Sequence, residues 1–213
     1  MQYFKYLFNT LIMFFLISHL NIAYSNDKKV FIAGEGSIAY HNMDDYAEEV
    51  GQGLANLTGN TVTGTYENAT WSGRLSGGYN ISNKFAIEIG YFFTGDIDLE
   101  WKGTYSGASW VATSANSAEG VDIAGRYNLD NNLYVKFGAH SSEISEVAQI
   151  KISSLTYTGK ATKSGTGALF GFGKREDMNN GLFWDGSVTY YDSLGGHSGA
   201  NIINFSLGIG KKF

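Results

Sequence analysis

The chain has 213 residues, of which 28 are glycine, 15% are aromatic and only 16% are charged, and it has neither proline nor cysteine. The aromatic content excludes a disordered chain, and the lack of cysteine excludes disulfides and thiolate metal sites. The formal net charge of −5, without a basic stripe, excludes nucleic acid as a natural partner.

The first 25 residues are typical of a secretory signal peptide. Lys5 precedes an apolar run from Leu11 to Leu20, and small residues lead up to Ser25. The run is shorter than the ~20 residues that a membrane-spanning helix needs. We therefore predict a signal peptide over 1–25, and any membrane crossing by the domain at 26–213 has to use strands.

From Val30 onward, apolar residues recur with a period of two, which is the periodicity of β-strands. Bulky apolar residues occupy one face of each segment, and small, polar or charged residues occupy the other. The segments lie at 30–40, 69–80, 85–94 with alternation continuing to Trp101, 121–129, 133–140, 166–173, 182–191 and 203–210. These eight segments predict an all-β chain that folds as an eight-stranded antiparallel up-and-down β-barrel.

The alternation alone also fits a water-soluble barrel of the lipocalin type, with its apolar faces inside. Charge distribution favours the transmembrane form, because the bulky faces are nearly uncharged and the polar faces carry a set of charges that suits a narrow lumen. This set comprises Glu35, Arg74, Glu88, Arg126, Lys136 and Asp185. Aromatic residues at the strand ends, such as Tyr40 and Trp71, are typical of membrane-interface girdles.

The connections alternate between short and long, as in outer-membrane barrels. Short turns are predicted at 80–84, 130–132 and 174–180. Long loops are predicted at 41–68, 103–117, 145–165 and 192–200. The short connections are expected to face the periplasm, and the four loops are expected outside the cell.

The loop at 41–68 has no lysine or arginine and carries five carboxylates, namely Asp44, Asp45, Glu48, Glu49 and Glu67. Met43, Tyr46, Val50, Leu54 and Leu57 recur within it at spacings of three or four, so it is also predicted to contain a short amphipathic helix. The acidic side chains could bind cations, a basic partner or a host surface. They could equally be solvated without any partner.

The chain resembles the small outer-membrane barrels of the OmpA transmembrane-domain and Opa-type surface-antigen group. The resemblance rests on the segments 120–127 and 130–138 and on the ending at 206–213. It implies residence in the bacterial outer membrane, contact with membrane lipid and lipopolysaccharide, and a monomeric barrel. It also implies that the barrel-assembly machinery reads the C-terminal set Phe205, Leu207, Ile209 and Phe213, although Lys211 departs from the usual apolar residue.

Three functions are compatible with these features. The favoured one is a structural or surface-interaction role, similar to that of an adhesin or antigen, through the external loops. A narrow porin-like channel gated by the lumen charges is the alternative. A third possibility is a lipid A-modifying hydrolase, since His140 and Ser142 match the spacing of the PagL deacylases. No enzymatic activity, cofactor or metal site is expected.

Overall fold

The computed structural model describes residues 29–42 and 44–213, so the predicted signal peptide at 1–25 lies outside the described residues. The strands are β1 (Val30–Asn42), β2 (Thr63–Tyr66), β3 (Ala69–Asn80), β4 (Phe85–Thr94), β5 (Ile97–Tyr105), β6 (Ala108–Asn128), β7 (Leu133–Ile152), β8 (Leu155–Asp177), β9 (Leu182–Tyr191) and β10 (Asn201–Lys212). The helices are α2 (Asp44–Thr58) and the single 3₁₀ turns η1 (Asp130–Asn132), η2 (Asn179–Gly181) and η3 (Leu194–Gly196). No described helix has the length and apolarity to cross a membrane.

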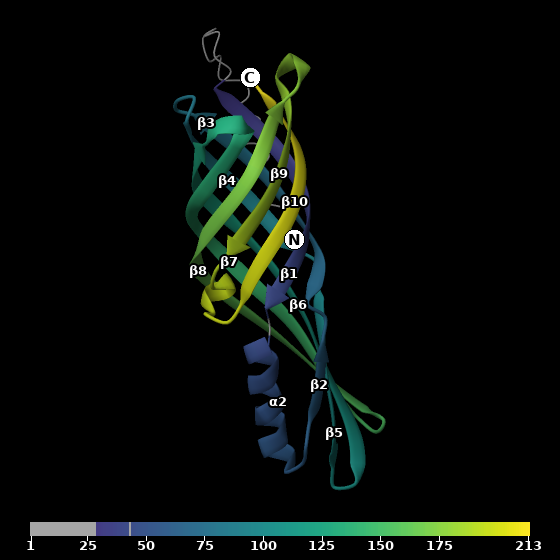
Figure 1. Cartoon of the computed structure of the whole chain (residues 1–213). Helices are drawn as coiled ribbons and strands as arrows, with labels where there is room; N and C mark the ends of the chain where they lie inside the picture. Colours follow the sequence, from purple (N-terminus) through teal and green to yellow (C-terminus); the bar gives the residue numbers. More distant parts are fainter. Residues whose placement is uncertain (1–28, 43) are drawn as a thin grey trace.

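Eight strands close into an antiparallel barrel in the order β1, β3, β4, β6, β7, β8, β9, β10, with β10 returning to β1 (Figure 1). β5 continues β4 after a break at Gly95 and pairs with the beginning of β6, while β2 pairs only with β5. The predicted fold class is therefore confirmed. Closure leaves no backbone edge open around the barrel wall, as a sheet in hydrocarbon requires.

The bulky apolar faces point outward and the polar faces point into the barrel. Ile38, Trp71 and Leu207 are 63%, 60% and 72% exposed, whereas Arg74 and Glu88 are buried. The register explains this, because neighbouring strands align residues of the same kind, as in the pair Glu35 and Arg74. A water-soluble barrel with an apolar interior is thus excluded.

Two of the predicted loops are wrong. Most of 103–117 belongs to β5 and β6, which turn at Ser106 and Gly107, and most of 145–165 belongs to β7 and β8, which turn at 153–154. These segments lie beyond the barrel wall, where the outer face of the sheet meets water instead of lipid, so the outward residues need not be bulky and apolar. The turn predicted at 174–180 also starts later, because β8 extends to Asp177 and therefore includes Arg175.

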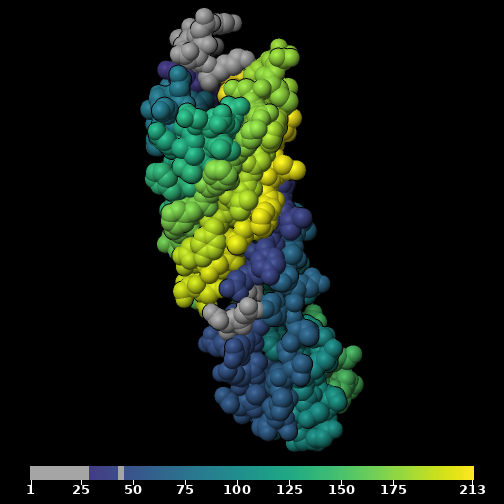
Figure 2. Space-filling model, viewed as in Figure 1, coloured from purple at the N-terminus to yellow at the C-terminus, as the bar shows by residue number. Residues whose placement is uncertain are grey.

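The long hairpins form a sheet that projects from one end of the barrel, at the bottom of Figure 1. We call this part the extension. It comprises α2, β2, β5 and the parts of β6, β7 and β8 at 108–116, 145–152 and 155–162. The opposite end, called the turn end below, has the short connections at 81–84, 129–132 and 178–181. Figure 2 shows the extension as a separate mass below the barrel.

Helix α2 packs against the inner face of the extension, where Ile97, Leu99, Trp101, Trp110 and Ala112 form a buried cluster. Tyr46, Val50 and Leu54 contact this cluster, so the predicted amphipathic helix is confirmed. Leu57 is an exception, because it is 81% exposed at the end of the helix, and Met43 lies outside the described residues. The indole Nε1 of Trp101 donates a hydrogen bond to the Ala47 carbonyl at 3.1 Å and fixes the helix on the sheet.

Candidate functional site: a layered lumen and a projecting sheet

Arg74 on β3 is at the centre of a network of charges inside the barrel. Its Nη1 lies 2.8 Å from Glu35 on β1 and 3.7 Å from Glu88 on β4. Its Nε and Nη2 donate to both carboxylate oxygens of Asp122 on β6, at 2.9 and 2.7 Å. One guanidinium thereby connects four strands. Each charge is buried, and such charges are stable only when they are paired and hydrogen-bonded.

Two further arginines extend the network toward the turn end. Arg126 Nη1 lies 2.6 Å from Glu88, and Arg175 Nε lies 2.7 Å from Asp185. Tyr134 donates its hydroxyl to the same Asp185 at 2.6 Å. The two guanidinium groups also lie against aromatic rings, with Arg175 Cζ 4.2 Å from the centroid of Phe183. These cation–π contacts partly replace the water that the charges lose on burial.

All six lumen charges predicted from the sequence lie inside the barrel. Five of them, Glu35, Arg74, Glu88, Arg126 and Asp185, are joined by the ion pairs above. Lys136 is also buried, but no described carboxylate lies within ion-pair distance of it. Asp122 and Arg175 belong to the network but were not included in the predicted set. The inward alternation of β6 could have revealed Asp122, whereas Arg175 was assigned to a turn.

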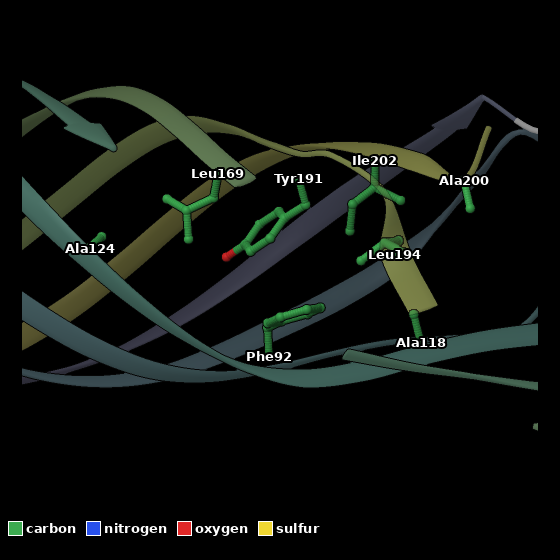
Figure 3. Packing of buried hydrophobic residues seen from close by; sticks show 8 residues of the cluster. All are labelled: Phe92, Ala118, Ala124, Leu169, Tyr191, Leu194, Ala200 and Ile202. Atoms are coloured by element: carbon green, nitrogen blue, oxygen red, sulfur yellow. The ribbon is translucent and has the colours of Figure 1, made fainter. Parts of the chain in front are cut away.

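A second, apolar layer fills the lumen between the charge network and the extension (Figure 3). Its members come from β4, β6, β8 and the stretch 191–202, and they are Phe92, Ala118, Ala124, Leu169, Tyr191, Leu194, Ala200 and Ile202. Phe92 and Tyr191 lie with ring centroids 4.6 Å apart. The Tyr191 hydroxyl donates to Asp122 at 3.3 Å, so this side chain joins the two layers.

The connection at 192–200 folds into the mouth of the barrel instead of extending away from it. His140 Nε2 donates to the Asp192 carbonyl at 2.7 Å, and Ser142 Oγ accepts a hydrogen bond from the Gly195 amide at 2.9 Å. A Cβ on Gly165 would lie 2.3 Å from the Cα of Gly196, so only glycine allows the loop this close to β8. His140 and Ser142 therefore hold the loop, and each bonds to its backbone instead of to the other.

The remaining predicted residues lie outside the lumen layers. Asp44 and Asp45 are in the first turn of α2, and Glu48, Glu49 and Glu67 are exposed. Phe205, Leu207 and Ile209 point outward from β10, and Phe213 follows its end. The role of this C-terminal set in recognition by the assembly machinery stays a prediction.

The outer surface of the extension has one further feature, a free sheet edge. β8 pairs with β9 only from Leu169 onward, so its other side has no partner strand between Leu155 and Thr162 in the described chain. All eight of these residues are exposed. The outward groove of about 600 Å³ on the same sheet is lined by Glu67, Asp98 and Glu100 among other residues.

Comparison with solved structures finds other small barrels. Ail, the attachment invasion locus protein of Yersinia pestis, is 11% identical with a TM-score of 0.49, and the match covers 87% of this chain and 99% of that one. Neisserial surface protein A is 14% identical with a TM-score of 0.41 (86% and 97% covered), and OprG from Pseudomonas aeruginosa is 13% identical with a TM-score of 0.42 (87% and 96% covered). No match is found among curated proteins. The family model of the OmpA-like transmembrane domain matches residues 33–190. The chain therefore belongs to the OmpA-like transmembrane-domain family and is a β-barrel of the bacterial outer membrane.

Proposed function

We propose that this protein acts at the cell surface, where the free edge of β8 binds an extended segment of a partner protein. The observation that supports this most directly is the unpaired stretch Leu155–Thr162, which is exposed along its whole length. Short connections face the periplasm in outer-membrane barrels, so the extension lies on the outer side of the membrane. An open strand edge offers a row of backbone donors and acceptors to another strand.

The hairpin geometry identifies the groups available for pairing. Ile152 and Leu155 flank a two-residue turn and pair with each other, so odd-numbered residues of this part of β8 bond to β7. The amides and carbonyls of even-numbered residues then face the open side. The same alternation holds farther along β8, where the Ala168 carbonyl accepts a hydrogen bond from the Asp192 amide on the β9 side.

The side chains around the edge favour an acidic partner over a second copy of the chain. Lys151, Lys160 and Lys163 lie on the β7–β8 hairpin, and none is within ion-pair distance of a described carboxylate. Antiparallel pairing of two copies along β8 would place two such sets of lysines together. A strand with aspartate or glutamate would instead neutralise them.

Selection of peptides on the membrane-embedded protein tests this function. The mature chain is reconstituted in lipid nanodiscs and used to select from a phage-displayed library of random peptides. We expect enrichment of peptides in which apolar and acidic residues alternate. Thr158→Pro removes one outward amide and places a ring on the edge without breaking the ladder to β7. We expect this variant to bind the selected peptides at least about tenfold more weakly.

Thr158→Ala is the matched control, since it changes the side chain and keeps the backbone donor. It should bind the peptides like the parent protein. If no peptide is enriched, or if Thr158→Pro binds as well as Thr158→Ala, the edge of β8 is not the binding surface. Heat-modifiable migration on a gel confirms that both variants retain the barrel.

A further inference from the structure

The lumen opens at the turn end into a cavity of about 690 Å³. This is the end of the barrel opposite to the extension, near the C terminus at the top of Figure 1. Among the described residues, four cationic side chains line the cavity, namely Lys29, Arg126, Arg175 and Lys212, and Asp177 is the one carboxylate. The lining therefore carries more positive than negative charge, although the buried carboxylates Glu88 and Asp185 behind it pair with the two arginines.

The cations of the cavity are only partly satisfied by the protein. Lys212 Nζ lies 2.6 Å from Asp177, whereas Lys29 has no described carboxylate within ion-pair distance. Arg126 has a partner at each nitrogen, since its Nε, Nη1 and Nη2 donate to Asn128, Glu88 and Asn80 at 3.1, 2.6 and 3.3 Å. The lysines stand at the rim and the arginines form the floor of this site.

Arg175 contributes a donor that has no acceptor. Its side chain is 8% exposed, and its Nε and Nη2 bind Asp185 and Glu88. Its Nη1 is buried and has no hydrogen-bond partner among the described residues. A buried donor without a partner costs free energy, and a charged donor gains most from an anionic oxygen.

From these observations we infer that the turn-end cavity is a binding site for a phosphate-type oxyanion. Lys29 and Lys212 contact the anion from the rim, and Arg175 attracts it through its positive charge at the floor. The volume also admits a phosphomonoester, whose organic part extends toward the open side. Since the short turns of outer-membrane barrels face the periplasm, the ligand comes from that compartment. This inference is independent of the function proposed for the extension.

Nuclear magnetic resonance of the mature chain in phosphatidylcholine nanodiscs tests the site. Sodium phosphate and glycerol phosphate are titrated separately, with chloride keeping the ionic strength constant. We expect saturable shifts of amides in the turns at 81–84, 129–132 and 178–181, and none in the extension. Tighter binding of glycerol phosphate identifies a phosphomonoester site, whereas equal binding identifies a site for the phosphate group alone.

The double variant Lys29→Gln, Lys212→Gln removes two rim charges and leaves the buried network intact. We expect it to weaken binding at least about tenfold. The matched control Lys151→Gln, Lys160→Gln makes the same change in net charge on the extension and should bind like the parent protein. Absence of saturable shifts with both ligands, or equal weakening in the two double variants, would overturn the inference.

Discussion

At the scale of single residues, the interior of the barrel is a neutral set of fixed charges. Four cations, Arg74, Arg126, Lys136 and Arg175, face four carboxylates, Glu35, Glu88, Asp122 and Asp185. Because the charges sum to zero and most lie in direct contact, the set can remain in a narrow lumen with little water. The network is stable only while all its charges are present, since removal of one member leaves another charge buried without a partner.

Arg74→Met should therefore be strongly destabilising. The substitution keeps much of the side-chain volume but leaves Glu35 and Asp122 without their main partner. We expect the free energy of unfolding to fall by about 3–5 kcal/mol. Urea unfolding of the refolded barrel in detergent micelles measures this. The control is Lys102→Gln, whose exposed ion pair with Glu100 should change stability by less than about 1 kcal/mol. Similar losses in both variants would contradict a buried network.

Tyr46 provides a titration that reports on helix docking. Burial, followed by the charge of Glu146 and the 3.1 Å hydrogen bond to it, raises the pKa of Tyr46 to about 12. A raised pKa means that the docked form loses stability as the pH rises from about 10, the ordinary tyrosine value, through 12. Below pH 10 this contribution is fully present.

Ultraviolet absorbance of tyrosinate measures this titration as the difference between the parent protein and Tyr46→Phe. We expect the difference signal to appear near pH 12, together with release of α2 over the same range. A difference signal centred near pH 10 would show that the phenol is not held against Glu146.

Much of the charged lumen could be predicted from the sequence, because successive residues of a transmembrane strand point alternately into the barrel and toward the lipid. Glu35, Arg74, Glu88, Arg126, Lys136 and Asp185 all follow it. Pairing could not be predicted, because it depends on the stagger between strands. Arg175 was missed because it lies in the charge run 174–177, which is typical of a turn. The roles of His140 and Ser142 could not be predicted, because they depend on the loop at 192–200 folding into the barrel.

At the scale of elements, the boundary between membrane and water explains which strands were predicted well. β3 and β9 have the predicted limits, because they lie within the barrel wall, where one face of each strand is apolar. β6, β7 and β8 are more than twice as long as predicted, with 21, 20 and 23 residues, since their far halves leave the wall. In the extension, the buried apolar residues lie on the inner face of the sheet, beneath α2.

Trp101 is expected to hold α2 on the extension. It is buried under the helix and donates to the Ala47 carbonyl, so Trp101→Ala removes one of the two largest side chains of this interface. Truncation of a buried tryptophan typically costs about 3–5 kcal/mol. We expect this loss to release the helix without opening the barrel, since the barrel strands have their own contacts.

Limited proteolysis distinguishes local release from global unfolding. The segment 41–68 lacks lysine and arginine, so a glutamate-specific protease is required, and Glu48 and Glu49 are its exposed targets on α2. We expect faster cleavage there in Trp101→Ala and unchanged heat-modifiable migration. Trp71→Ala, on the exposed outer wall, is the control and should be cleaved like the parent. Unchanged cleavage in Trp101→Ala would show that other contacts hold the helix.

At the scale of the whole molecule, the parts are arranged in series along the barrel axis. The cationic cavity lies at the turn end, the charge network and the apolar layer follow, and the extension projects at the far end. The two middle layers fill the lumen by different interactions, one by ion pairs and the other by packing around Leu194. The proposed functions therefore lie at the two ends of the molecule, where surfaces are accessible.

This serial arrangement predicts that the barrel does not conduct ions, in contrast to the porin-like alternative. In planar lipid bilayers we expect no steady single-channel current from the refolded mature chain. Leu194→Gly should also stay closed, because it opens the apolar layer but leaves the ion pairs of Arg74 in place. Only the combination of Leu194→Gly with Arg74→Ala removes a barrier from each layer, and this variant should show current. Steady current through the parent protein, changed by Glu88→Gln, would instead establish a channel gated by the lumen charges.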